Sequence, residues 1–264
     1  MEVDPVSMAT LSQAKACVAF LYGALPPGDD EPEPIGTCFF GGVGDQGDPD
    51  FFYLVTARHV YESLENAGHA WVRVNKPGGG TSTIPIILER SAWLFHEDNS
   101  VDLAVLPWTQ ARWQGLPVEL HYWPLDWVFI YDAEWLREGE EAVFVGLMRP
   151  FPGKQRNLTM LRRGMFGLLP DEPILGRYGL SDYYVLDAQS YKGNSGAPVF
   201  NAEGSFFLVG VLTYAFGDEA EKVVIEGTSS SYYNLGVSLV TPVRKVEEII
   251  QKHLASRKKT IAGD

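Results

Sequence analysis

The chain has little cysteine, no excess of positive charge and no long apolar run. Only Cys17 and Cys38 occur among its 264 residues. Secreted proteins often rely on several disulfides, so we expect two reduced core thiols and a cytoplasmic location, with one bridge across a first hairpin as the alternative. No run reaches the ~20 apolar residues of a membrane helix. Residues 1–5, Met-Glu-Val-Asp-Pro, contain two acidic residues and lack the basic start and the long apolar stretch of a secretory signal.

Positive charge is scarce relative to negative charge. The chain has 21 Lys and Arg against 34 Asp and Glu, a formal net charge of −13. Such a surface repels the phosphates of nucleic acids and of anionic membranes, so we expect neither as a partner and ascribe the acidity to solubility. No cluster with metal-ligand spacing occurs, and we expect neither a metal nor another cofactor.

Short apolar runs separated by turn signals dominate the rest of the sequence. The 27 glycines and 12% aromatic residues are typical of a turn-rich β protein, and this pattern favours a barrel or a sandwich over βαβ units. We expect short helices at 9–16 and within 58–67, and a terminal helix at 241–252 with Val243, Val246, Ile250 and Leu254 on one face. The expected strands are 17–22, 36–42, 51–56, 71–75, 84–89, 101–106, 141–146, 160–169, 183–187, 197–200, 206–214 and 235–240.

Three residues beside apolar strands have the side chains that nucleophilic catalysis needs: a serine, a histidine and an aspartate. Ser195 lies between Asn194 and Gly196, in a turn whose Gly193 and Ser195 amides could hold an oxyanion. A serine hydroxyl needs a base, for which His59 at the end of a strand is suited. Asp102 could orient that imidazole. Singly, each residue is better explained by packing or by a turn, but together they predict a catalytic triad.

The order and context of these residues resemble the chymotrypsin-like serine proteases. Residues 56–59, Thr-Ala-Arg-His, and 102–106, Asp-Leu-Ala-Val-Leu, resemble the histidine and aspartate motifs of that family. Intervals of 43 and 93 residues separate the three positions. Residues 187–201, which contain Gly-Asn-Ser-Gly-Ala-Pro, are most similar to the bacterial HtrA (Deg) branch. The similarity extends from about residue 35 to residue 243.

This resemblance implies an all-β fold of two six-stranded antiparallel barrels followed by a helix. A single trypsin-like peptidase domain at 1–264 would contain an N-terminal barrel at about 16–115, a C-terminal barrel at about 136–242 and a helix at about 242–256. We expect no PDZ domain after the peptidase region and therefore no assembly or regulation through one. The implied function is a serine endopeptidase that cleaves protein or peptide substrates. Because a cytoplasmic protease needs restraint, we also expect it to be latent until an activating protein partner orders its loops.

The resemblance also implies a specificity pocket. Gln189 would lie at its base, Gly236 in its wall, and Thr213, Tyr214 and Ala215 on the strand that pairs with substrate. A neutral Gln189 disfavours lysine or arginine in the pocket and favours a small or medium uncharged side chain. Ordinary strand packing is the alternative explanation for these residues.

Three departures from the family pattern are informative. Arg58 stands where secreted relatives have a disulfide cysteine. Asn194 replaces the aspartate of trypsin, so activation through an ion pair with a new amino terminus is not expected. Ala197 adds a methyl group after the serine turn. A non-cleaving peptide-binding module and a self-processing viral-type protease remain alternatives. His69, His96, His121 and His253 have no comparable context and are expected to be surface or packing residues.

Overall fold

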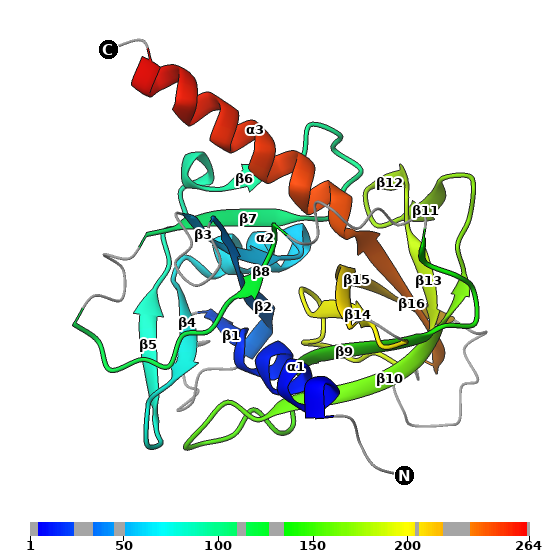
Figure 1. The fold of residues 1–264 in the computed structure, drawn as a ribbon, viewed down its shortest axis with the longest axis horizontal. Helices are drawn as coiled ribbons and strands as arrows, with labels where there is room; N and C mark the ends of the chain where they lie inside the picture. Colours follow the sequence, from blue (N-terminus) through cyan, green and yellow to red (C-terminus); the bar gives the residue numbers. More distant parts are fainter. Residues whose placement is uncertain are drawn as a thin grey trace, which may run out of the picture.

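The computed structural model describes residues 5–23, 34–44, 51–109, 115–126, 135–203, 206–218 and 233–262. Strands dominate these residues and form two halves that lie side by side, with a long helix at the end of the chain lying across the top of both (Figure 1). None of the helices in the described ranges is long and apolar enough to cross a membrane.

The first half is one antiparallel sheet in which the strand order is β5-β4-β1-β2-β3-β7-β6. A short strand, β8, joins it by parallel pairing with β2. In β4, side chains alternate between the core and the surface, as expected for a sheet with one covered face. Its strands are β1 (Val18–Gly23), β2 (Pro34–Val43), β3 (Phe51–Thr56), β4 (Ala70–Asn75), β5 (Thr81–Pro85), β6 (Leu94–Phe95), β7 (Ala104–Trp108) and β8 (Trp123–Pro124).

The second half is a closed six-stranded barrel with the order β10-β13-β16-β15-β14-β9. A two-stranded hairpin, β11 and β12, lies outside it. Closure removes the free edges that an open sheet would leave. The strands of this half are β9 (Glu141–Leu147), β10 (Thr159–Leu168), β11 (Ile174–Gly176), β12 (Gly179–Ser181), β13 (Tyr184–Asp187), β14 (Pro198–Asn201), β15 (Phe207–Asp218) and β16 (Tyr233–Pro242).

Three α-helices accompany the strands: α1 (Pro5–Ala16), α2 (Arg58–Ala67) and α3 (Val243–Ala262). Helix α2 ends at Gly68, whose φ of 76° allows its amide to bond back to the Glu65 carbonyl. Helix α3 follows β16 directly and contacts β6 and β7 of the first half as well as β15. Its predicted apolar face is confirmed, because Val243, Val246 and Ile250 are buried.

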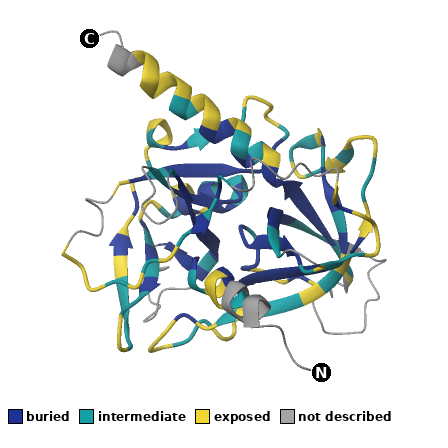
Figure 2. Cartoon of the chain, viewed as in Figure 1, coloured by how far each residue is buried: buried dark blue, intermediate teal, exposed yellow. Residues whose placement is uncertain are grey.

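One hydrophobic core joins the two halves. It contains Phe39 and Tyr53 from the first sheet, Leu147 and Val211 from the barrel, and Val246 from α3. Buried segments accordingly meet where the sheet, the barrel and the first turns of α3 come together, while the later turns of α3 are exposed (Figure 2). Packing between the halves therefore fixes any site built from both.

Only one of the two expected barrels is closed among the described residues. After β5, the Ile86 amide bonds to the Ala70 carbonyl, and a 3₁₀ turn at Arg90–Ala92 precedes the two-residue β6. These irregular residues replace the long strand expected at 84–89, so no pairing of β5 with β6 closes the described sheet. The strand expected at 101–106 begins only at Ala104, and β6, β8, β11 and β12 were not expected.

Both cysteines are free and buried, which confirms the expectation of two core thiols. Burial raises the pKa of the Cys17 thiol to about 12 and that of Cys38 well above its ordinary value. The thiolate is the nucleophilic form of cysteine, and a raised pKa keeps these thiols protonated. Neither cysteine is therefore a candidate for catalysis.

Candidate active site

His59 and Asp102 are joined by two hydrogen bonds in the first half. The His59 ring Nδ1 lies 2.7 Å from Asp102 Oδ2, and the His59 backbone amide donates to Asp102 Oδ1 at 3.0 Å. Asp102 is buried and ionised carboxylates only accept, so its partner Nδ1 carries the hydrogen. The other ring nitrogen, Nε2, is then left with a lone pair that can accept a proton.

Arg58 ties the histidine helix to neighbouring segments. Its Nε donates to Glu62 Oε1 at 2.9 Å and its Nη1 donates to the Asn99 carbonyl at 3.1 Å. Its guanidinium lies 4.6 Å from the centre of the Tyr178 ring, and the Tyr178 hydroxyl donates to Glu62 at 2.5 Å. Arg58 therefore links α2 to the loop before Asp102 and to the hairpin of β11 and β12.

Ser195 follows a tight turn that starts at Tyr191. The Asn194 amide donates to the Tyr191 carbonyl at 2.9 Å, and Gly193 has a φ of 101°. A positive φ at the third residue defines a type II turn, which favours glycine there. Among the described residues, no group accepts the Gly193 or Ser195 amide. Both amides therefore remain available to bind an anion.

Thr37 of β2 holds this turn against the first half. Its hydroxyl donates to the Gly193 carbonyl at 2.6 Å and accepts the Leu147 amide at 2.9 Å. The Thr37 amide also donates to the Ser195 carbonyl at 3.0 Å. Gly196 packs closely against Thr37, because a Cβ on Gly196 would lie 2.0 Å from the Thr37 carbonyl oxygen. Sequence reasoning missed Thr37, since no local motif marks it.

Asn194 fixes the turn from its other side. Its side-chain Nδ2 donates to the Leu147 carbonyl at 2.6 Å, and its Oδ1 accepts the Tyr191 amide at 2.7 Å. The residue is buried. A neutral amide thus orders the turn through two hydrogen bonds, where the trypsin aspartate would need a partner of opposite charge.

Ser195 and His59 line the same cleft, of about 930 Å³, between the two halves. Among the described residues, no hydrogen bond joins the Ser195 hydroxyl to the His59 ring. Such contacts are often long in structures without substrate. The first half supplies Ile35, His59, Val60 and Ser63 to the cleft, and the second half supplies Arg149, Arg177, Ser190, Tyr191, Lys192, Gly193, Ser195, Leu212, Thr213, Tyr214, Ala215 and Phe216.

The structure brings part of the expected specificity pocket into this cleft. Thr213, Tyr214 and Ala215 line it, whereas Gln189 and Gly236 do not. Gln189 is exposed and accepts a hydrogen bond from the Tyr191 hydroxyl at 3.0 Å. Ser190, which sequence reasoning missed, lines the cleft instead, and its hydroxyl lies 2.7 Å from that of Ser238.

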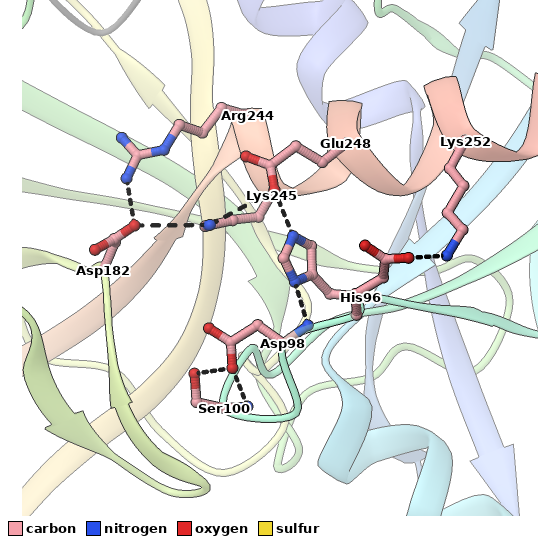
Figure 3. A network of polar contacts seen from close by, with 9 residues as sticks. His96, Asp98, Ser100, Asp182, Arg244, Lys245, Glu248 and Lys252 are labelled. Atoms are coloured by element: carbon pink, nitrogen blue, oxygen red, sulfur yellow. Dashed lines mark hydrogen bonds and ion pairs between the residues drawn. The ribbon is translucent and has the colours of Figure 1, made fainter. Parts of the chain in front are cut away.

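The loop before Asp102 is held by α3. His96 Nε2 lies 2.5 Å from Glu248, and His96 Nδ1 accepts the Asp98 amide at 3.0 Å (Figure 3). Two hydrogen bonds from Ser100 lower the pKa of the Asp98 carboxyl. Arg244 donates to Asp182 at 2.6 Å, which ties α3 to the segment between β12 and β13. His96 therefore belongs to an ordered polar network rather than to a simple surface position.

Comparison with known families agrees with this geometry. A family model described as a trypsin-like peptidase domain matches residues 36–211. The chain belongs to this family. No curated protein matches it.

Two solved structures show that the trypsin-like peptidase fold extends over most of the chain. The MamO protease domain from Magnetospirillum magneticum, in its apo form, is 15% identical, with a TM-score of 0.56 over 89% of this chain and 96% of that one. The HtrA-type protease AlgW, solved with a decapeptide, is 19% identical, with a TM-score of 0.57 over 94% of this chain and 67% of that one. The fold is thus chymotrypsin-like, with one closed six-stranded barrel and a C-terminal helix.

Proposed function

We propose that the protein is a serine endopeptidase that uses His59, Asp102 and Ser195. The observation that carries this proposal is the orientation of the His59 ring. Its Nδ1 is held at 2.7 Å by the buried Asp102, which leaves Nε2 as the base in the cleft that Ser195 lines. Membership of the trypsin-like peptidase family supports the same activity.

In the proposed reaction, Ser195 Oγ forms a bond to the carbonyl carbon of a peptide while His59 Nε2 takes the hydroxyl proton. The carbonyl oxygen becomes an oxyanion, which the Gly193 and Ser195 amides stabilise. Collapse breaks the C–N bond, and the leaving amine takes the proton from His59. Water then attacks the acyl-enzyme with His59 as base, which releases the acid and restores Ser195.

Strand pairing gives an extended substrate a place to bind. β14 pairs with β15 only as far as Val211, and the Leu212 amide and carbonyl bond to Ala197 and Gly196. Beyond Leu212, β15 pairs with β16 on one side, which leaves the other edge at 213–216 facing the cleft in the described structure. A peptide can add to such an edge as a further strand.

The proposed substrate is therefore a protein or peptide in extended conformation. Ser190, Thr213 and Ala215, which line the cleft, are uncharged, and this supports the predicted preference for an uncharged side chain at the cleaved position. The second barrel, the domain boundaries, the cytoplasmic location and activation by a protein partner stay predictions.

Labelling with a fluorophosphonate probe tests the nucleophile without knowledge of the substrate. We expect the wild-type protein to be labelled and the Ser195→Ala variant not to be. Ser63→Ala is the matched control, because Ser63 lines the same cleft and its hydroxyl only bonds to the His59 carbonyl. Removal of a nucleophile of this kind lowers kcat by about 10⁶-fold. A folded wild-type protein that is labelled neither alone nor after addition of cell lysate, which would supply an activating partner, would contradict the proposal and support the non-cleaving binding module.

A further inference from the structure

The cleft carries positive charge although the whole chain is acidic. Arg149, Arg177 and Lys192 line it, and none of its described lining residues is an aspartate or a glutamate. The chain as a whole has 34 acidic against 21 basic residues. A cluster of one sign in a concave site focuses the electrostatic potential there, so the cleft attracts ions opposite to those that the rest of the surface attracts.

The three cations lie at two places in the cleft, two beside the oxyanion turn and one at Tyr214 of β15. Arg149 packs beside the oxyanion turn, because a Cβ on Gly193 would lie 2.8 Å from Arg149 Cγ. Lys192 is exposed and directly precedes Gly193 in the same turn. Arg177, between β11 and β12, lies with its guanidinium 5.8 Å from the centre of the Tyr214 ring, along the edge of β15 where a peptide would pair.

Two of these cations, Arg177 and Lys192, differ from several other basic residues of the surface in whether they form ion pairs. Arg156, Arg163 and Arg244 each form an ion pair with a carboxylate. Within the described part of the chain, Arg177 and Lys192 form none. Both are exposed in the cleft, so a carboxylate arriving there meets cations that no described acidic group neutralises.

We propose that the cleft selects acidic peptide segments, with one carboxylate beside Arg177 and Tyr214 and a second beside Lys192 and Arg149. The selection of cleavage sites rests on the proposed peptidase function, whereas the selection of bound peptides does not. Arginine forms bidentate bonds with carboxylates, and lysine acts as a point charge. For partly exposed pairs, we expect about a fivefold preference for each contact, falling as salt is added.

The test compares two peptide libraries that differ only in charge. One contains Asp and Glu at random positions around neutral residues, and the other has Asn and Gln in their place. Cleavage sites are identified by mass spectrometry with wild-type protein, and binding is measured by fluorescence anisotropy with Ser195→Ala. We expect the acidic library to be cleaved and bound more strongly, with acidic residues enriched on both sides of the cleaved bond.

Charge-reversal variants then assign the acidic preference on each side of the cleaved bond to one cation of the cleft. Arg177→Glu should remove the acidic preference at the positions that pair with β15, and Lys192→Glu should remove it across the cleaved bond. Lys258→Glu makes the same charge change on an exposed late turn of α3 and should leave both preferences intact. Thermal unfolding of each variant shows whether it is folded, and the milder Arg177→Gln and Lys192→Gln changes replace any variant that is not.

The possible results separate the two proposals. Fluorophosphonate labelling with no acidic preference in either assay overturns the acidic substrate and leaves the peptidase proposal standing. Acidic binding by Ser195→Ala without labelling of wild type overturns the peptidase and supports an acidic ligand. A preference that survives both charge reversals, or that Lys258→Glu abolishes equally, overturns the assignment to this cleft.

Discussion

The two halves of the molecule hold their candidate catalytic groups in different ways. In the first half, side chains hold His59: the Asp102 carboxylate bonds to its ring, and Arg58, which also pairs with Glu62 within the helix, ties the helix to the Asn99 carbonyl. In the second half, the Thr37 and Asn194 side chains bond to the turn before Ser195, but the turn itself depends on glycine backbone in a tight space. Gly193 and Gly196 have positive φ, and Gly196 has no room for a Cβ.

This difference shows which kind of change each half can tolerate. One side-chain contact can be weakened while the contacts beside it persist. If the bond between Asp102 and the His59 ring is lost, for example, Asp102 can still accept the His59 backbone amide. A glycine in a closely packed turn cannot be replaced by a residue with a mild effect. Any side chain there meets backbone atoms that cannot move independently. Changes in the glycine turn at Ser195 should therefore cost more stability than changes in the side-chain contacts of the first half.

The largest effect is expected from Gly196→Ala. Its Cβ would lie 2.0 Å from the Thr37 carbonyl oxygen at a φ of 89°. Backbone strain and overpacking together should lower the free energy of unfolding by about 3 to 5 kcal/mol. The matched control is Gly68→Ala, where φ is 76° and nothing lies within 4 Å of an added Cβ. Strain alone should cost about 1 to 2 kcal/mol there. Equal urea midpoints for the two variants would break the comparison.

An intermediate effect is expected from Thr37→Val. The new side chain keeps the volume but cannot donate to the Gly193 carbonyl or accept the Leu147 amide. Loss of these bonds should reduce stability by about 1 to 3 kcal/mol. Because the oxyanion turn loses its anchor, kcat should fall by about 10²-fold. Kinetics of fluorophosphonate labelling and of peptide cleavage measure this change.

Thr83→Val in β5 is the control for Thr37→Val, because Thr83 is exposed and lies outside the cleft. It should change neither stability nor labelling measurably. If Thr37→Val labels as fast as this control, the turn does not depend on the contact with the first half.

The smallest effect is expected from His253→Phe. His253 Nδ1 lies 3.1 Å from the Tyr53 hydroxyl, where α3 contacts β3. Burial, and then the nearby Arg257, lowers the pKa of His253. The unfolded state therefore binds its proton more readily, and this histidine lowers stability as the pH falls below about 6.5. Because the residue is partly exposed, solvent screening should limit the loss to about 0.5 kcal/mol.

Urea unfolding at pH 5 and pH 7.5 measures the contribution of His253. The variant should lose less stability between these two pH values than wild type does. His69→Phe removes an exposed histidine and should leave the pH dependence as it is in wild type. The interpretation fails if both variants show the same pH dependence.

The sequence predicted the strands of the second half well. Their apolar runs are bounded by glycine, proline or acidic turns, and the six runs became the six strands of the closed barrel. Prediction was poorer in the first half. Residues 84–89 are apolar enough for a strand, but the Ile86 amide bonds to Ala70, and β5 ends at Pro85. Pairing partners decide such boundaries, and a local pattern does not contain them.

The candidate triad could be predicted because His59, Asp102 and Ser195 each stand in a recognisable local context. Thr37, Ser190, Arg149 and Arg177 could not, since their place in the site comes from packing between distant segments. Thr37, for example, contacts Gly193, which is 156 residues away in the chain. For Gln189, a position counted from Ser195 does not contain the surroundings of the side chain, which is exposed and is not among the residues that line the cleft, so its role in specificity stays a prediction.

The hairpin of β11 and β12 has a thermodynamic consequence for substrate binding. Arg177 at its turn lies over Tyr214 in the cleft, while the next residue, Tyr178, bonds to Glu62 and stacks on Arg58 beside the histidine helix. A ligand that binds Arg177 therefore acts on the same short segment that supports α2. If a ligand at Arg177 stabilises the His59 helix, linkage requires the reverse as well: whatever orders that helix raises the affinity for the ligand by the same factor.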